Sequence, residues 1–195
     1  MANIVIAYHS GSHHTEAVAL EVAKGAESTG CNVIVHNVEN PVERIWNDLA
    51  AADCIIFGSP TYMGDVSSAF KKFAEDTSKP WFKQEWKNKL AAGFTNSGTP
   101  AGDKLATLQS LSVLAAQHGM LWVNCGVMPS AYTGDGQNLN QYAHYLGLAT
   151  VSQSAPVSET NPPAEDRQTA RNFGIHIGRS TKQWSYGKAV HATAA

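Results

Sequence analysis

The chain has 195 residues, of which 43% are hydrophobic and 15% charged, a composition typical of a globular protein and not of a disordered one. Its formal net charge is −2, from 14 Lys and Arg against 16 Asp and Glu, which argues against a protein held to nucleic acid by a basic surface. No run approaches the ~20 apolar residues that a membrane helix needs, and no signal peptide is visible, so we expect a cytoplasmic protein.

Short apolar runs alternate with helix-length segments along the chain. The first run, NIVIAY at Asn3–Tyr8, is almost continuously apolar, which is typical of a strand buried on both faces. The segment Thr15–Ser28 follows, with apolar residues at helical spacing and Gly30 just beyond its end. The later expected elements are strand Asn32–His36, a short helix Pro41–Ala51, strand Asp53–Ser59, helix Val66–Asp76, strand Leu90–Asn96, helix Asp103–His118, strand Leu121–Cys125 and helix Pro163–Trp184.

Strands separated by helices indicate a parallel sheet with right-handed crossovers. Five strands suit an open doubly wound sheet better than a barrel, which needs eight. No internal repeat, linker or low-complexity block interrupts the pattern. We therefore expect one domain over residues 1–195, with a frayed tail over residues 185–195.

Ligands of open α/β sheets bind beyond the carboxyl ends of strands, so the loop after the first strand is a candidate site. Ser10, Ser12 and Thr15 carry hydroxyls there, and the helix that follows offers free N–H groups and partial positive charge to a phosphate. The loop has no Lys and a single Gly, which excludes the GxxxxGK[ST] and GxGxxG nucleotide motifs. Helix capping by Ser10 or Thr15 is the structural alternative.

Histidines and cysteines do not predict a metal site. His13 and His14 are adjacent and point in different directions, and no Asp, Glu or Cys in their loop completes a ligand set. The cysteines, Cys31, Cys54 and Cys125, have no metal-type spacing, so we expect buried, reduced thiols and no metal.

Two further strand ends carry loops of similar composition. The third strand is followed by Pro60, Thr61, Tyr62, Met63, Gly64 and Asp65, and the fourth ends in Thr95, Asn96, Ser97, Gly98 and later Gly102. A flat aromatic ligand with polar edges needs this mixture of small polar and large apolar groups. Turn residues before helices, with Asp65 as an N-cap, would give a similar sequence. Three such loops on one edge of the sheet favour a ligand site.

Together the loops resemble the flavodoxin-like family, most nearly NAD(P)H:quinone oxidoreductases of the WrbA type and NAD(P)H-dependent FMN reductases. The matching pieces are YHSGSHHT at Tyr8–Thr15, GSPTYMGDVS at Gly58–Ser67, FTNSGTPAGDKLATLQSL at Phe94–Leu111 and QHGM at Gln117–Met120. The resemblance implies a three-layer α/β/α sandwich with a five-stranded parallel sheet in the order 2-1-3-4-5. It also implies FMN as cofactor, NADH or NADPH as co-substrate, a quinone or flavin as substrate, and a homodimer or homotetramer, with no nucleic acid and no membrane insertion.

The resemblance also assigns roles to residues. The FMN phosphate would be held by Ser10, Ser12, His13, His14 and Thr15; the isoalloxazine would be wrapped by Pro60, Thr61, Tyr62, Met63, Gly64 and Asp65; and the ring and ribityl chain would be bordered by Thr95, Asn96, Ser97, Gly98 and Gly102. His118 resembles a family histidine that a neighbouring subunit places near the flavin, and Trp81 an aromatic residue over the substrate side. A structural histidine at a helix end is the alternative for His118.

Some features depart from the family pattern. The family usually has Gly or Asn where this chain has His13, and the segment Lys79–Lys89 is an insertion. Asp135-Gly136 resembles a family loop near the ring.

Two other functions remain open: a flavodoxin-type electron carrier, although carriers tend to be more acidic, and an FMN reductase that releases reduced flavin. A nucleotide-free binding module on the same fold is a third.

Overall fold

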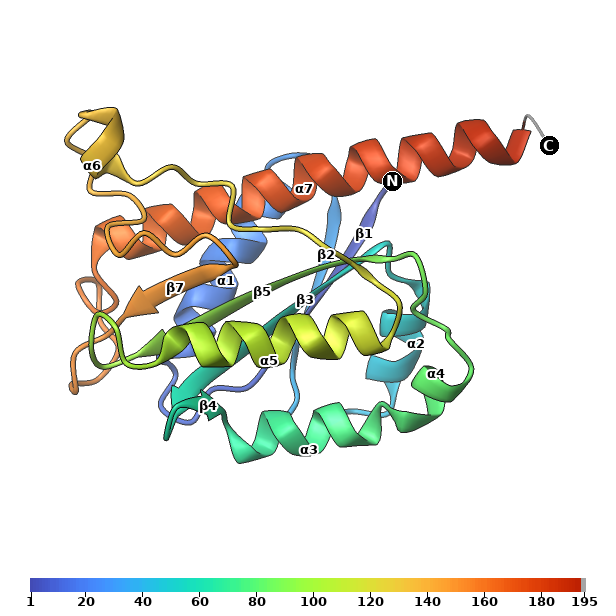
Figure 1. The fold of residues 1–195 in the computed structure, drawn as a ribbon, viewed down its shortest axis with the longest axis horizontal. Helices are drawn as coiled ribbons and strands as arrows, with labels where there is room; N and C mark the ends of the chain where they lie inside the picture. The colour runs from blue at the N-terminus through green and yellow to red at the C-terminus, as the bar shows by residue number, and fades with distance from the viewer. Residues whose placement is uncertain (194–195) are drawn as a thin grey trace.

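A computed structural model of the chain describes residues 1–193 as three layers, with helices on both faces of a central sheet (Figure 1). The strands are β1 (Asn3–Tyr8), β2 (Asn32–Asn37), β3 (Cys54–Tyr62), β4 (Asp65–Val66), β5 (Leu90–Ser97), β6 (Leu121–Trp122) and β7 (Leu148–Val151). The helices are α1 (His14–Glu27), α2 (Arg44–Ala51), α3 (Ser68–Asp76), α4 (Ser78–Phe82), α5 (Lys104–Gln117), α6 (Ser130–Thr133) and α7 (Ala164–Thr193). The three-layer α/β/α fold is therefore confirmed.

The parallel strands lie in the order β2-β1-β3-β5-β6, which is the expected 2-1-3-4-5 arrangement with β5 as fourth strand and β6 as fifth. The expected number of five strands is wrong, because β4 pairs antiparallel with β3, and β7 pairs with the end of β5. The fifth position is split. β6 pairs with the start of β5 at Leu90↔Leu121, β7 with its end at Phe94↔Leu148, and residues 123–147 leave the sheet between them.

Side chains of β1 alternate between two cores, which explains why its sequence is apolar throughout. Ile4 and Ile6 pack on the side of α1 and α7, whereas Val5 and Ala7 pack on the side of α2, α3 and α5. A strand covered by helices on both faces has no solvent-facing side, so it needs no polar alternation.

The helices α1 and α7 pack against each other at unusually close range. A Cβ atom at Gly174 would lie 2.1 Å from the Val22 carbonyl oxygen, and one at Gly25 would lie 2.0 Å from the Arg171 carbonyl oxygen. These two glycines therefore let the helix backbones touch. The contact fixes α1, whose N-terminus follows the first candidate loop.

The tail expected to be frayed over residues 185–195 is instead part of α7 as far as Thr193. No proline interrupts the segment, and Lys188 Nζ lies 5.9 Å from the ring centre of Trp184, one turn earlier. Residues 194–195 lie outside the described part of the chain. Over residues 1–193 no helix has the length and apolar character needed to cross a membrane.

Candidate functional site

Four loops meet at the carboxyl edge of the parallel sheet, at the end where β7 lies in Figure 1. They enclose a cavity of about 200 Å³ lined by Ser10, Ser12, His14, Thr15, Pro60, Tyr62, Asn96, Ser97, Gly98, Ser152, Gln153 and Ser154. Three of the lining segments are the loops singled out in the sequence. The fourth, Ser152–Ser154, was missed because β7 before it was not predicted, although the run LATV at Leu148–Val151 is a short strand signal.

The first loop presents a helix N-terminus and hydroxyls to the cavity. The N-cap residue His13 makes no side-chain capping bond, so the His14 and Thr15 N–H groups of the first turn remain available to an anion. Ser10 Oγ accepts from the Glu16 N–H at 3.1 Å, so capping accounts for part of its role and its own hydrogen can still be donated. The Thr15 side chain is buried and lines the cavity, and its hydroxyl bonds to no residue within the described chain.

The two histidines of this loop point away from the cavity or toward another loop. His13 has φ 62°, in the left-handed region, and its exposed ring bonds to Glu16 Oε2 at 2.7 Å. Its side chain is therefore not brought to the cavity, and its positive φ is a conformation that Gly and Asn adopt more readily than His. His14 Nε2 lies 2.8 Å from the Ala155 carbonyl oxygen, which ties the first loop to the segment after β7.

The second loop turns through Met63 and Gly64, which have φ of 50° and 82° between the paired residues Tyr62 and Asp65. Two positive φ values are what a tight type I′ hairpin requires, and Met63 adopts this conformation despite its side chain. Met63 is fully exposed and does not line the cavity, and Asp65 accepts from Ser110 Oγ at 2.6 Å. Asp65 does not cap α3, because that role belongs to Ser67.

Two of the predicted site residues hold loops together and do not line the cavity. The buried Thr61 hydroxyl lies 2.8 Å from both the Thr95 and the Thr107 hydroxyls. This triad joins the end of β3 to β5 and α5. Thr61 and Thr95 thus fix the distance between the second and third loops.

The third loop offers an amide to the cavity and is fastened from behind. Asn96 Oδ1 accepts from Thr150 Oγ1 at 2.8 Å and from Ser152 Oγ at 3.0 Å, and its Nδ2 bonds to no described residue. Lys104 is fully buried and donates to the Thr99 and Pro100 carbonyls, and burial lowers its pKa to about 8. Gly102 has φ 50°, and a Cβ atom there would lie 2.6 Å from Ser97 Oγ.

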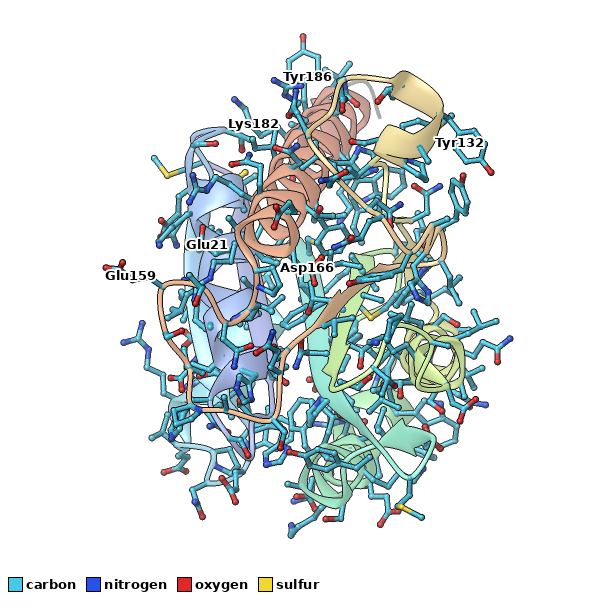
Figure 2. The ribbon with its side chains drawn as sticks, turned by 90° about the vertical axis from the view of Figure 1, so that its left-hand side faces the viewer. Glu21, Tyr132, Glu159, Asp166, Lys182 and Tyr186 are labelled. Carbon is cyan, nitrogen blue, oxygen red and sulfur yellow. The ribbon has the colours of Figure 1, made fainter. Side chains whose placement is uncertain are left out.

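The segment after β7 is anchored to α7 by a buried carboxylate. Asp166, at the start of α7, accepts from the Val151 N–H at 2.7 Å (Figure 2). Burial raises the pKa of Asp166. The anchor places Ser152–Ser154 against the cavity.

Trp81 and His118, which the resemblance assigns to catalysis beside the flavin, lie at the opposite edge of the sheet. Helix α5 has 14 residues, about 21 Å of length, and runs from the carboxyl edge back to the start of β6. His118 follows its last turn, beside the Gly119 carbonyl that accepts from Asn88 N–H just before β5. Trp81 and His118 share a hollow of about 240 Å³ there, so the described chain does not bring them to the cavity.

His118 is enclosed by other side chains, with an exposed fraction of 1%. Its ring stacks on Trp86 with centroids 4.2 Å apart, and its Nε2 donates to Thr77 Oγ1 at 2.9 Å, since the Thr77 hydroxyl itself donates to Ala74 O. Burial lowers the pKa of His118 to about 4. These contacts fit the structural alternative for this histidine.

Asp135 also lies away from the cavity. It follows α6, whose exposed Tyr132 points outward in Figure 2, and lines a hollow beside His176 and Arg179 of α7. The expected position of Asp135-Gly136 near the ligand is thus not observed in this chain.

The cysteines are buried, as expected, and burial raises the pKa of Cys54 to about 12 and that of Cys125 to about 11. Such thiols are chemically inert. Across residues 1–193 no group of three His, Cys, Asp or Glu side chains could hold a metal ion.

The residues present fit the polar part of FMN. The cavity lining has hydroxyls, an amide and a helix N-terminus but no Lys or Arg, so a phosphate would be held by neutral donors. Its volume is below the roughly 300 Å³ at which pockets for whole drug-sized ligands begin, which suits a phosphate and ribityl chain. A larger groove of about 570 Å³ lies between α3 and α5 and is lined also by Asp65 and Val66 of β4.

Comparison with known proteins identifies the family of the chain. The sequence profile described as NADPH-dependent FMN reductase matches residues 16–134. The chain is 35% identical to Flavodoxin FldP of Pseudomonas aeruginosa, over 94% of this chain and 98% of that protein, and 30% identical to an NAD(P)H dehydrogenase (quinone) of Archaeoglobus fulgidus, over 91% and 96%. A solved flavodoxin, WrbA-like protein from Agrobacterium tumefaciens has a TM-score of 0.74 and 40% identity, over 94% of this chain and 99% of that one.

Proposed function

The chain belongs to the NADPH-dependent FMN reductase family, and from this premise we propose that it transfers electrons from NADH or NADPH to a quinone or similar small acceptor. FMN is the cofactor, with NAD(P)H as the family's reductant. Family membership makes the chain an FMN-binding oxidoreductase, and reduction of a quinone is the activity that we propose for it.

The observation that carries the proposal is the combination of polar donors in the cavity with large exposed side chains on one of its loops. Ser10, Thr15 and Asn96 offer neutral donors inside, whereas Tyr62, which also lines the cavity, is half-exposed and the neighbouring Met63 is fully exposed. A flat apolar acceptor gains most from such a surface, because stacking and burial require no charged partner. Relatives described as NAD(P)H dehydrogenase (quinone), at 25 to 30% identity over more than nine-tenths of this chain, support the same acceptor class.

The protein's own part in the reaction is to bind and orient. When bound, FMN supplies the hydride and electron transfer. Ser10 and Thr15 hold the phosphate end, Lys104 and the threonine triad keep the third loop in place, and Tyr62 and Met63 border the acceptor. Within a single copy, His118 is not required to relay a proton.

We propose a catalytic role for His118 and Trp81 only within a homodimer or homotetramer. One copy places both residues at the amino edge of its own sheet, so they could meet only the FMN of a second copy. His118 would then have to leave its stack on Trp86.

The test is steady-state oxidation of NADH and of NADPH by the FMN-loaded protein with benzoquinone as acceptor. We expect turnover on the order of 1 to 10³ per second, the ordinary range for enzymes. Free FMN at the same concentration is the control for cofactor that has dissociated. Oxidation no faster than with that control would contradict the proposal.

An electron carrier is the second candidate, favoured by the 35% identity to Flavodoxin FldP across nearly the whole of both chains. A carrier would oxidise NAD(P)H slowly with benzoquinone alone and rapidly once a separate flavoprotein reductase is added. An FMN reductase would instead reduce added free FMN and lose its flavin on gel filtration.

A further inference from the structure

A buried histidine joins the phosphate loop to the segment that follows the loop Tyr62–Asp65. His9 follows β1 and directly precedes Ser10 of the phosphate loop, and Ser67 follows β4 and caps α3. The two residues are 5% and 2% exposed, and His9 Nδ1 lies 2.7 Å from Ser67 Oγ. Neither residue lines the cavity, so any effect on FMN must act through the loops.

The hydrogen bonds around Ser67 leave its hydroxyl hydrogen available to His9. Ser67 Oγ accepts from the Phe70 N–H at 3.3 Å, and Ser59 Oγ accepts from the Ser67 N–H at 3.0 Å. The Ser59 hydroxyl donates to the Pro60 carbonyl at 2.9 Å, a shorter bond than its 3.3 Å contact with Ser67. The Ser67 hydroxyl is therefore free to donate to His9 Nδ1, an arrangement in which the ring proton lies on Nε2.

The other side of the ring agrees with a neutral, Nε2-protonated His9. Nε2 faces Glu39 Oε2 at 3.9 Å, from the loop after β2, too far for a hydrogen bond. Burial lowers the pKa of His9 more than Glu39 raises it. Neutral His9 is the form that can accept from Ser67.

We propose that His9 is a positioning residue that holds the phosphate loop and the loop Tyr62–Asp65 at the spacing FMN requires. The proposal rests on FMN being the ligand of this cavity and is independent of the electron acceptor. FMN would contact both loops, so bonds at its two ends would form together only if the loops are already fixed relative to each other. Riboflavin lacks the phosphate and gains little from that coupling.

The test compares FMN and riboflavin binding to flavin-free protein, by quenching of flavin fluorescence, in wild type, His9→Leu and His9→Asn. We expect His9→Leu to weaken FMN about tenfold, the loss of roughly one hydrogen bond, and riboflavin by less than about threefold. Asn places a side-chain acceptor close to the position of Nδ1, so His9→Asn should recover most of the FMN affinity. A fold defect would weaken both ligands by the same factor, since it only lowers the competent population.

The variant Ser67→Ala breaks the same bond from the other side and keeps the test informative if His9→Leu folds poorly. It should reproduce the selective loss for FMN, and the double variant should add little to either single change. Equal losses for FMN and riboflavin, unchanged FMN affinity, or His9→Asn no better than His9→Leu would overturn the proposal. A wild-type protein that binds neither flavin would overturn the cofactor itself and this inference with it.

Discussion

Replacing Thr15 by Val tests whether neutral donors hold the phosphate. Thr15 is 2% exposed, lines the cavity from the first turn of α1, and its hydroxyl bonds to nothing else in residues 1–193. Valine has the same shape and branching, so the apoprotein loses no internal hydrogen bond. A hydrogen bond to a charged group is worth about 1.5–3 kcal/mol, which predicts FMN binding about 10- to 150-fold weaker.

The assay is titration of flavin-free protein with FMN and with riboflavin, followed by fluorescence quenching. Only FMN should lose affinity in Thr15→Val, because riboflavin has no phosphate. Thr181→Val is the matched control, since that buried hydroxyl donates to the Ile177 carbonyl within α7 and does not line the cavity. Equal losses for both flavins, or none for FMN, would refute the assignment of the phosphate to this loop.

Three further changes probe the surrounding structure. Gly102→Ala puts a Cβ atom 2.6 Å from Ser97 Oγ at φ 50°, so urea unfolding should show a stability loss of about 1–3 kcal/mol, and FMN should bind more weakly. Gly174→Ala forces α7 away from Val22 and should lower the unfolding temperature without selectivity between flavins; an unchanged temperature would contradict the close packing. His118 has a folded-state pKa of about 4 against an ordinary 6.5, so the unfolded chain alone takes up its proton between these values and stability is lost as pH falls from 6.5 toward 4. At pH 5 the free energy of unfolding should be lower by about 2 kcal/mol for this reason. The variant His118→Phe, which can still stack on Trp86, should not show this loss. An equal loss of stability between pH 7.5 and pH 5 in wild type and His118→Phe would refute the prediction.

The sequence was informative where one physical signal dominated. The continuous apolar run of β1 reflects burial on both of its faces, and the helical spacing of apolar residues in α1 reflects burial on one face. Both elements occur within about one residue of their expected bounds. The loops holding Ser10, Pro60 and Asn96 were found because strand ends of a parallel sheet share an edge.

Other parts could not be found because their signals were weak. Strand β7 has four residues and follows a polar, glycine-containing stretch, so neither its pairing with β5 nor the contribution of Ser152–Ser154 was expected. The roles of Thr61 and Thr95 depend on side-chain direction, which periodicity does not give.

The position of His118 follows from topology rather than from its motif. A helix that leaves the carboxyl end of β5 must return to the amino edge before β6 begins, so a residue at its end lies far from the strand-end loops. The motif shows which family residue His118 resembles, whereas the chain path from β5 through α5 to β6 determines where His118 lies.

The most direct test of the central claim is the absorbance spectrum of the protein after incubation with FMN and removal of free flavin by gel filtration. The structure and family membership predict a protein-bound flavin band at about one FMN per chain, reduced by Thr15→Val and unaffected by Thr181→Val. Protein that emerges without any flavin band would contradict the assignment of FMN to this cavity.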